Sequence, residues 1–305
     1  MNPDLEQHPG LLLHDIARLF RQCFGQRLRD LGLSEAQWRA LGTVNKFPGI
    51  SQTQLAQLLG IGKVPLGKLI HKLEAEGLLL RSADSADSRV KLLRIAASAA
   101  PLTQLIVDRH SQFQNCYLRG VSPRRQQQLE RTLKTMHHNL SEQSGTEPGP
   151  ANSQALTLMH LISGISRLNS RLFNLQLKQI GFTRSQWLVM TAIGRREGWQ
   201  QSQLAQELNM GKAPLGVLID ELEAGNWVQR RVHPQDRRAR TLHLTRDCRR
   251  QLQSLGESFE ELHTSALTGV AERERQSLSA SLTSIRDQLK FIAKGNSDEP
   301  REENT

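Results

Sequence analysis

The chain has 305 residues, enough for two domains of ordinary size, each with its own hydrophobic core. Its formal net charge of +10 favours an anionic partner, nucleic acid before a membrane surface, because no lipidation motif or basic amphipathic anchor stands out. Aromatic residues make up only 4%, so the chain is poorly suited to stacking single-stranded bases, and duplex DNA is the better candidate partner.

The same inspection argues against several other classes of protein. The polar N-terminus MNPDLEQHPG does not resemble a secretory signal, and no apolar run is long enough to cross a membrane. Three scattered cysteines, Cys23, Cys116 and Cys248, fit neither a disulfide framework nor a zinc site. Neither a Gly-rich phosphate loop nor a nucleophile elbow is present in the sequence. We therefore expect a cytoplasmic protein that is not an enzyme and has no cofactor or bound metal.

The sequence contains one unit twice. A shift that places Gly32 on Gly181 overlays the chain on itself without a gap as far as Leu93. Between residues 52–75 and 201–224, two thirds of the aligned positions are identical. A two-copy repeat of this length indicates a duplicated domain, because the units of a solenoid are far shorter.

Composition sets the expected domain boundaries. We expect a first domain at residues 8–141, a flexible linker at 142–153, a second domain at 154–294 and a disordered tail at 295–305. The linker region is rich in Ser, Pro and Gly and has no periodic apolar pattern, and the tail GNSDEPREENT is polar throughout.

Both copies show the same order of predicted elements. Apolar positions at helical spacing predict a long first helix near residues 10–31, with its counterpart at 154–180. A second helix is expected at 34–46, with Ser34 as its N-cap. Two helices separated by a very short turn follow at 53–59 and 63–76, and Gly77 and Asn226 provide left-handed stops. A β-hairpin comes next, and the closing helices lie near 99–118, 123–140, 246–267 and 272–294. The expected fold is mainly α with a small β-hairpin wing, in two tandem copies.

The helix pair at 53–76 is typical of a helix-turn-helix, whose second helix enters the major groove. Lys63 and Lys212 begin that helix in the two copies, where a lysine is unfavourable for the helix itself. An external anion would explain both lysines, and a solvated side chain is the alternative. Gly67 and Gly216 follow one turn later, and either close approach of DNA or tight packing against the preceding helix would account for them.

Residues 226–245, NWVQRRVHPQDRRARTLHLT, predict two short strands around a Pro-containing tip. The arginines assigned to this tip are Arg230, Arg231, Arg237, Arg238 and Arg240. An arginine at a hairpin tip can enter the minor groove, although a charged hairpin is otherwise a solvated edge. Asp87 and Asp236 stand two residues before an arginine, and we expect them to hold that arginine and the turn in place.

The wing and the helix-turn-helix resemble the MarR (multiple antibiotic resistance regulator) family of bacterial transcription factors. Asp236-Arg237-Arg238-Ala239-Arg240, ending in Leu244-Thr245, is similar to the family's wing, and QSQLAQELNMGKAPLGVLIDELEAGNWVQR is similar to its helix-turn-helix. The element order matches the family's winged-helix fold. The first copy departs from the pattern at Ser88 and Ala96, which replace a wing arginine and a threonine.

The resemblance implies a sequence-specific regulator of transcription that binds double-stranded DNA. Related proteins are ordinarily homodimers joined through their first and last helices, so two copies in one chain imply a monomeric pseudo-dimer on an asymmetric operator. The resemblance also implies a repressor relieved by a small aromatic or anionic effector, held between the dimerising helices and the DNA-reading lobe. An alternative remains open, in which one copy no longer binds DNA and the chain serves as a protein-interaction scaffold or antirepressor.

The residues expected to contact DNA lie in the helix-turn-helix and wing of both copies. In the first copy they are Gln52, Thr53, Lys63, Val64, Pro65, Lys68, His71, Arg81, Arg89 and Lys91. In the second copy they are Gln201, Ser202, Lys212, Ala213, Pro214, Arg231, Arg237, Arg238 and Arg240. Because Lys68 and His71 become Val217 and Asp220, copy one is expected to rely on its helix and copy two on its wing.

Overall fold

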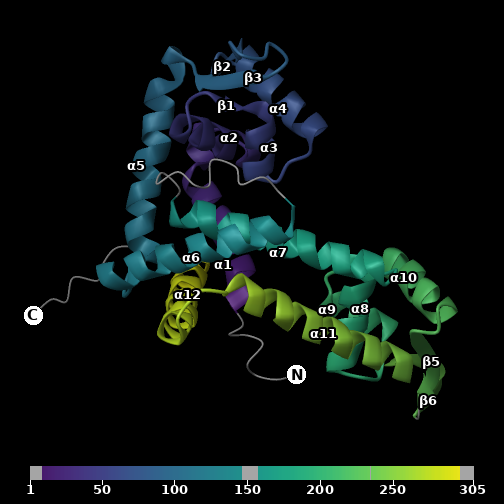
Figure 1. Cartoon of the computed structure of the whole chain (residues 1–305). Helices are drawn as coiled ribbons and strands as arrows, with labels where there is room; N and C mark the ends of the chain where they lie inside the picture. Colours follow the sequence, from purple (N-terminus) through teal and green to yellow (C-terminus); the bar gives the residue numbers. More distant parts are fainter. Residues whose placement is uncertain (1–8, 146–156, 234, 296–305) are drawn as a thin grey trace, which may run out of the picture. The chain divides into compact units, whose positions relative to one another are not determined.

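The computed structural model describes residues 9–145, 157–233 and 235–295, and at residues 236–238 it describes the backbone alone. The expected linker from residue 146 onward and the expected tail from residue 296 onward lie outside the described residues. The fold is mainly helical with two small three-stranded sheets, as the sequence predicts apart from the third strand of each sheet (Figure 1).

The chain divides into two compact units. The smaller unit holds Asn169–Ser265, and the larger unit combines Pro3–Leu168 with Ala266–Thr305. The boundaries fall inside helix α7 (Leu158–Gln179) and at the end of helix α11 (Arg246–Ala266). The larger unit therefore contains all the described elements of copy one together with the start of α7 and the last helix, α12 (Glu272–Ala293). The domain boundaries expected from the repeat remain a prediction.

Capping residues explain where the first helices of the larger unit begin and end. Helix α1 (Pro9–Arg27) stops four residues earlier than predicted and continues as the short 3-10 helix η2 (Arg29–Leu31), which Gly32 closes at a φ of 66°. The predicted N-cap of α2 (Glu35–Lys46) is confirmed, because the Ser34 hydroxyl accepts from the Gln37 amide in a capping box. The left-handed stop at Gly77, with a φ of 68°, is confirmed as well.

The helix-turn-helix of copy one consists of α3 (Gln52–Leu59) and α4 (Lys63–Ala75). Gly60 ends α3 in the left-handed region, where its amide reaches the carbonyls of the preceding turn. Leu66, Ile70 and Leu73 recur at helical spacing on α4 and are fully buried, so one face of this helix belongs to the core and the other is exposed.

A three-stranded antiparallel sheet forms the wing of each copy. In the larger unit the order is β1 (Ile50–Ser51), β3 (Lys91–Ile95) and β2 (Leu79–Ala83). In the smaller unit the order is β4 (Trp199–Gln200), β6 (Asp236–Leu244) and β5 (Val228–His233). The hairpins are confirmed, but the sequence analysis missed β1 and β4, because two residues are too few to show an alternating pattern.

Long helices close the larger unit. Helices α5 (Ala100–Tyr117) and α6 (Pro123–Gln143) follow the sheet, and α12 packs against α1, α5 and α6. Leu282, Ile285 and Leu289 of α12 are completely buried in this bundle. Copy two thus supplies a helix to the core that also holds the first and last helices of copy one.

The smaller unit contains the counterparts of α2, α3 and α4, which are α8 (Arg184–Arg195), α9 (Gln201–Glu207) and α10 (Lys212–Ala224). In each copy, we call these three helices and the sheet that follows them the reading lobe. Its core joins Val189 and Met190 of α8 to Leu215 and Ile219 of α10 and to Leu242 of β6. Two asparagines occupy left-handed positions that glycine holds in copy one. Asn226 follows α10 at a φ of 57°, as predicted, and Asn209 follows α9 at a φ of 47°.

Candidate nucleic-acid interface

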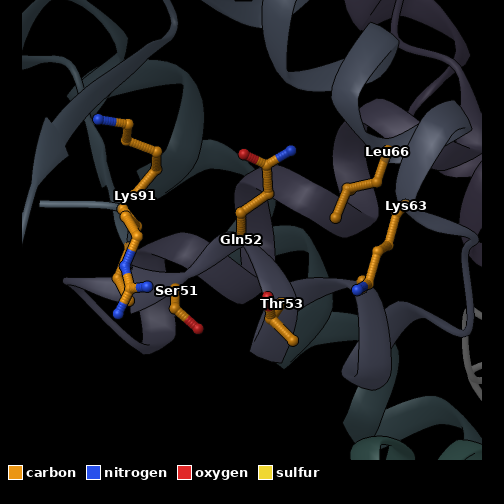
Figure 2. A pocket seen from close by; sticks show the side chains of 9 residues that line it. Ser51, Gln52, Thr53, Lys63, Leu66 and Lys91 are labelled. Carbon is orange, nitrogen blue, oxygen red and sulfur yellow. The ribbon is translucent and has the colours of Figure 1, made fainter. Parts of the chain in front are cut away.

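A polar cleft of about 240 Å³ lies between the helix-turn-helix and the wing of copy one. Its lining includes five of the residues predicted to contact DNA: Gln52, Thr53, Lys63, Arg89 and Lys91. Figure 2 shows Lys63 and Lys91 on opposite sides of the cleft, with Gln52 and Thr53 between them. The fold therefore brings together side chains from α3, α4 and β3 that are far apart in the sequence.

Ser51 also lines the cleft and was not among the residues predicted to contact DNA. Ser51 is the N-cap of α3, where its hydroxyl accepts from the Gln54 amide at 3.1 Å and completes a capping box. The Ser-x-x-Gln spacing ahead of an apolar run is the signal that could have identified it. Since a cap of this kind sets where a helix begins, Ser51 positions Gln52 and Thr53 at the first turn of α3.

Helix α4 begins at Lys63 with no side-chain cap, because Gly62 precedes it. Its first amides therefore have no hydrogen-bond partner from a capping side chain, and Pro65 fits there since it lacks an amide hydrogen. Val64 is 72% exposed, and Lys68 and His71 lie farther along the exposed face of the helix, outside the cleft.

The glycine in the second turn of α4 is not required by packing. A Cβ at Gly67 would meet only the Gln52 side-chain amide, at an ordinary contact distance of 3.8 Å. A Cβ at Gly216 of α10 would meet the matching Gln201 amide at 3.2 Å, and that atom is the end of a flexible side chain. Of the two explanations left open by the sequence, tight packing against the preceding helix has little support.

Asp87 organises the wing of copy one. Its carboxylate accepts from the Arg89 amide at 3.0 Å and from the Arg89 guanidinium at 3.0 and 3.1 Å. These hydrogen bonds, the side-chain one first, lower the pKa of Asp87. The carboxylate therefore stays ionised and aligns an arginine whose side chain is 89% exposed.

Asp84 is a second organiser of this wing, and the sequence analysis did not single it out. Its carboxylate accepts from the amides of Ala86 at 2.7 Å and Asp87 at 3.2 Å, as an aspartate does in an Asx turn. Lys91 reaches back to the Ser88 carbonyl at 3.0 Å. An aspartate followed by small polar residues between two strands was the available signal.

Arg81 does not reach the cleft. Its guanidinium lies 2.9 Å from the Glu74 carboxylate of α4, because β2 begins directly after that helix and the side chain points back along it. Arg230 behaves in the same way in copy two, where it binds Asp220 at 2.5 Å and also pairs with Glu223. Assigning Arg230 to the hairpin tip was wrong, since it sits in β5 facing α10.

Copy two presents a different surface. Lys212, Ala213 and Pro214 are exposed at the start of α10, as their counterparts are in copy one. Farther along, Val217 is 58% exposed, and Asp220 and Glu221 replace the basic residues of α4. Gln201 and Ser202 begin α9, and Arg231 and Arg240 are exposed on the hairpin. The side chains of Asp236, Arg237 and Arg238 lie outside the described residues.

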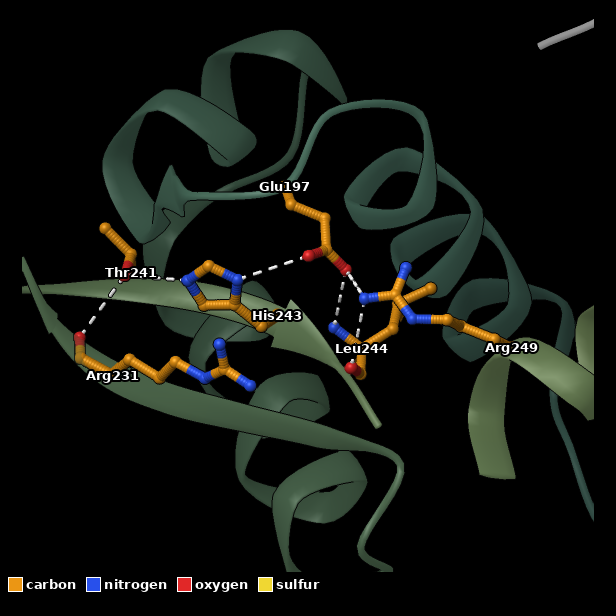
Figure 3. A network of polar contacts seen from close by, with 6 residues as sticks. All are labelled: Glu197, Arg231, Thr241, His243, Leu244 and Arg249. Atoms are coloured by element: carbon orange, nitrogen blue, oxygen red, sulfur yellow. Dashed lines mark hydrogen bonds and ion pairs between the residues drawn. The ribbon is translucent and has the colours of Figure 1, made fainter. Parts of the chain in front are cut away.

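A polar network in copy two fixes the base of its wing (Figure 3). Glu197 accepts from the Leu244 amide at 3.4 Å, contacts His243 at 3.4 Å and pairs with Arg249 of α11. Burial alone raises the pKa of Glu197, but the hydrogen bonds from His243 and Arg249 outweigh it and leave the pKa below its usual value. At the position of Glu197, copy one has Pro48, so this network belongs to the second wing.

That network continues into the hairpin. The Thr241 hydroxyl lies 3.0 Å from the His243 ring and donates to the Arg231 carbonyl at 3.3 Å (Figure 3). Thr241 is 4% exposed. The backbone that carries Arg231 is thereby tied to the α8–β4 loop.

A second cavity, of about 410 Å³, lies in the larger unit beneath the reading lobe of copy one. Phe20, Phe24 and Trp38 provide aromatic walls. Its cationic lining residues are Arg21, Arg39, Lys46 and Arg167. Arg167 comes from α7, and therefore from copy two, and it could not have been assigned to this place from sequence spacing.

The buried thiols are packing groups. Cys23 is completely buried in α1, where its sulfur lies 3.6 Å from the Leu289 carbonyl of α12, and burial raises its pKa. Cys248 is also buried, 3.4 Å from the Met190 sulfur, and burial raises its pKa to about 11. Neither thiol is activated as a nucleophile.

Within the described residues, no helix is both long and apolar enough to cross a membrane.

The MarR family model matches the chain twice, at residues 31–89 and 180–239. These two segments contain the helix-turn-helix and most of the wing of each copy. The two matches agree with the duplication seen in the sequence.

Several solved structures are similar to the chain. A mutant of MepR from S. aureus, bound to an oligodeoxyribonucleotide, is 22% identical with a TM-score of 0.39, over 44% of this chain and 99% of that one. MarR from E. coli, in its apo form, is 22% identical with a TM-score of 0.36, over 42% and 96%. A SlyA-like transcription regulator from Listeria monocytogenes is 23% identical with a TM-score of 0.38, over 43% and 91%.

Proposed function

We propose that the chain, which the MarR family model matches at two places, is a transcriptional regulator that binds double-stranded DNA. The observation that carries this proposal is the cleft of copy one, where Lys63 and Lys91 flank the exposed starts of α3 and α4. The net charge of +10 is consistent with an anionic partner such as DNA.

The cleft has the chemistry of a phosphate site. The amides at the start of α4 and the positive end of the helix dipole favour an anion, and Lys63 adds a full charge at the same place. Lys91 approaches from the wing. A phosphate held between them would align α4 with the major groove, where Lys68 and His71 on its exposed face reach base edges. Gly67 then permits close approach of the DNA backbone.

Copy two uses its wing more than its helix. Asp220 is held by Arg230, and Glu221 accepts from the Gln186 side chain at 3.0 Å, so the exposed part of α10 is acidic. Phosphate contact there is unfavourable beyond the first turn at Lys212. Arg231 and Arg240, which are exposed on the hairpin, supply a basic surface instead. Because the two copies contact DNA through different surfaces, the operator is expected to be asymmetric.

One chain takes the place of a homodimer. In the larger unit α12 of copy two packs against α1 and α6 of copy one, and the contacts are specific as well as apolar. The Asn139 side-chain amide donates to the carbonyls of Ala266 and Thr268 at 3.0 Å each. Ser277 donates to its own counterpart in the repeat, Gln128, at 3.5 Å. Equivalent residues meeting across an interface indicate a pseudo-two-fold axis.

The regulator acts as a repressor that a small effector releases. The 410 Å³ cavity has a volume suited to a small ligand, aromatic walls and an excess of positive charge, which fit an aromatic or anionic molecule. Leu58 and Leu59 at the end of α3 line it, so a ligand there contacts the helix-turn-helix directly.

A second candidate function is a protein-interaction scaffold or antirepressor in which only one copy reads DNA. The exposed Val217 beside Asp220 and Glu221 favours this reading, because an acidic and apolar helix face is better suited to a protein than to DNA. Footprinting decides between the two functions, since the scaffold would protect a single half-site.

Selection of bound duplexes from a random library, followed by fluorescence anisotropy, tests the proposed function. The chain is expected to enrich a non-palindromic sequence and bind it more weakly as salt increases. Arg237→Ala with Arg238→Ala should lower the affinity strongly. Undiminished affinity of that double variant at moderate salt would exclude the second wing from the interface.

A further inference from the structure

A path of hydrogen bonds runs from the carboxylate of Glu197 through the ring of His243 and the hydroxyl of Thr241 to the carbonyl of Arg231 (Figure 3). Its three links measure 3.4 Å from the carboxylate to Nδ1, 3.0 Å from Nε2 to the hydroxyl and 3.3 Å from the hydroxyl to the carbonyl. The path joins the α8–β4 loop to β6 and then to β5. It ends on a residue that is predicted to contact DNA.

The carboxylate at the start of the path is held firmly and stays ionised. Arg249 and the Leu244 amide both donate to one oxygen of Glu197, and the other oxygen faces His243. Burial acts against ionisation, but the hydrogen bonds from His243 and Arg249 keep the pKa of Glu197 below its usual value. Glu197 can therefore only accept hydrogen bonds.

The donors and acceptors along the path require two protons on the ring. Since Glu197 can only accept, Nδ1 of His243 must donate to it. The Thr241 hydroxyl has a single hydrogen, which it donates to the Arg231 carbonyl, so it offers the ring only a lone pair. Nε2 must then donate as well. All three links are made only when His243 is the doubly protonated imidazolium.

Loss of either ring proton breaks one link. With a hydrogen on Nδ1 alone, the Thr241 hydroxyl turns to Nε2 and releases the Arg231 carbonyl. With a hydrogen on Nε2 alone, Nδ1 presents a lone pair to the Glu197 carboxylate, and the ring is no longer held from that side. Histidine is the side chain whose charge ordinarily changes between about pH 5 and 8. The path is therefore complete at the acid end of this range.

Charged groups on three neighbouring elements face the ring of His243. Glu197 of the α8–β4 loop attracts the protonated ring through a direct contact. Arg231 of β5 repels it, because the strands pair Arg231 with Thr241 and so place Arg231 and His243 diagonally on the same face of the hairpin. Arg249 of α11 also repels it, but from beyond the carboxylate. A change at Glu197 should therefore affect the path most.

The path has no equivalent in the sequence of copy one. The shift that overlays the copies replaces its three side chains with Pro48, Leu92 and Arg94, which provide no carboxylate, hydroxyl or imidazole. Asp84 and Asp87 organise the first wing nearer its tip instead. The two wings are thus held in different ways.

We propose that Glu197 and His243 are positioning residues, which hold Arg231 for contact with DNA phosphate when His243 is protonated. The backbone at Arg231 needs such support, because the register of the hairpin shifts at Val232/His233, immediately beyond it. The inference rests on the proposed function for the role of Arg231, but the path itself needs no DNA. The second wing should be held more firmly at pH 6 than at pH 8.

Glu197→Gln separates this proposal from a merely structural role. The amide oxygen of glutamine can keep the hydrogen bonds from the Leu244 amide and Arg249, and its NH2 group then faces His243. That NH2 group donates to Nδ1 of the neutral ring, and Nε2 carries the hydrogen that Thr241 accepts. The path is then complete without a charged ring. A residue with a structural role alone would only be weakened by the change.

Hydrogen–deuterium exchange of the full chain tests the path without DNA. After correction for intrinsic rates, peptides that cover β5 and β6 should exchange more slowly at pH 6 than at pH 8. Glu197→Gln should be as protected at pH 8 as the unmodified chain at pH 6, whereas Glu197→Ala should exchange rapidly at both. His71→Gln, on α4 of copy one, is the matched control and should behave as the unmodified chain.

Thermal melts by circular dichroism report whether each variant is folded, and His243→Gln provides a second variant in which the pH difference should disappear. The proposal is overturned if the unmodified chain shows no pH difference, if Glu197→Gln exchanges as rapidly at pH 8 as Glu197→Ala, or if His71→Gln removes the difference.

Fluorescence anisotropy with the selected duplex tests the consequence for DNA. At pH 8, Glu197→Gln should tighten binding about 2- to 10-fold, the range for one regained hydrogen bond. Asp247→Asn, which removes the same charge from an exposed position on α11, should give a smaller gain. In an Arg231→Ala background, Glu197→Gln should add nothing. An equal gain from Asp247→Asn, or a gain that survives Arg231→Ala, overturns the positioning of Arg231.

The two measurements separate this inference from the proposed function. A chain that binds duplex but shows no pH-dependent exchange in the second wing refutes the inference alone. A chain that shows the expected exchange but binds no duplex refutes the proposed function alone.

Discussion

Neutralising the two lysines of the copy-one cleft gives the most quantitative test of the interface. Lys63 and Lys91 lie on opposite sides of the cleft, and both side chains are exposed (Figure 2). Lys63→Gln with Lys91→Gln removes two positive charges at the cost of a single surface hydrogen bond, from Lys91 to the Ser88 carbonyl. The variant should fold normally and lose two phosphate contacts.

The size of the effect follows from counterion release. Each phosphate contact contributes about 0.9 to the slope of the logarithm of the binding constant against the logarithm of salt concentration. Two lost contacts should therefore make the slope shallower by about 1.8. Over the fourfold rise from about 50 to 200 mM salt, the affinity advantage of the unmodified chain should shrink by about 12-fold.

Fluorescence anisotropy with the selected duplex, repeated at four or more salt concentrations, measures both slopes. Lys134→Gln with Lys290→Gln is the matched control, because both lysines are exposed on the long helices α6 and α12 and the change in net charge is the same. An equal reduction of the slope in the control would show that net charge alone is responsible. An unchanged slope in the cleft variant would remove Lys63 and Lys91 from the interface.

Three further predictions concern stability, reactivity and pH. Gly67→Ala has room for its methyl group and should stabilise α4 by about 1 kcal/mol in urea unfolding while weakening DNA binding; unchanged binding would show that DNA does not approach there closely. Ellman's reagent should modify Cys116 in the folded chain, and Cys23 and Cys248 only after unfolding; rapid reaction of a buried thiol would contradict its packing. Burial, Arg167 and His138 lower the pKa of His137 to about 4 in the folded chain. Between pH 6.5 and 4, His137 is therefore protonated in the unfolded chain and neutral in the folded chain. The free energy of unfolding should fall across that range, and less so in His137→Gln; an equal fall in that variant would contradict this.

Local signals made much of the fold predictable. The capping box at Ser34, the left-handed stops at Gly77 and Asn226, and the helical spacing on α4 each depend on residues within one or two turns. The duplication supported the predicted order of helices and strands, because the same pattern occurs in both copies. The strands β1 and β4 escaped detection since their pairing with β3 and β6 is non-local.

The candidate site was predictable in part. Lys63 and Lys91 could be proposed from a helix start and a wing, but their meeting across one cleft depends on how β3 packs against α3. Arg81 and Arg230 show the opposite case, where a basic residue in the correct segment is bound by a nearby carboxylate. Arg167 reaches its cavity only through the packing of α7 in the larger unit, which no local pattern reports.

The proposed function requires that one chain reads one operator with two unequal lobes. Hydroxyl-radical footprinting of a selected duplex, with the mass of the complex measured by sedimentation, tests it most directly. We expect one 34.4 kDa chain per duplex and two protected segments of unequal strength, about one or two helical turns apart. Two chains on each duplex, or protection of a single segment, would contradict the proposal that one chain replaces a homodimer.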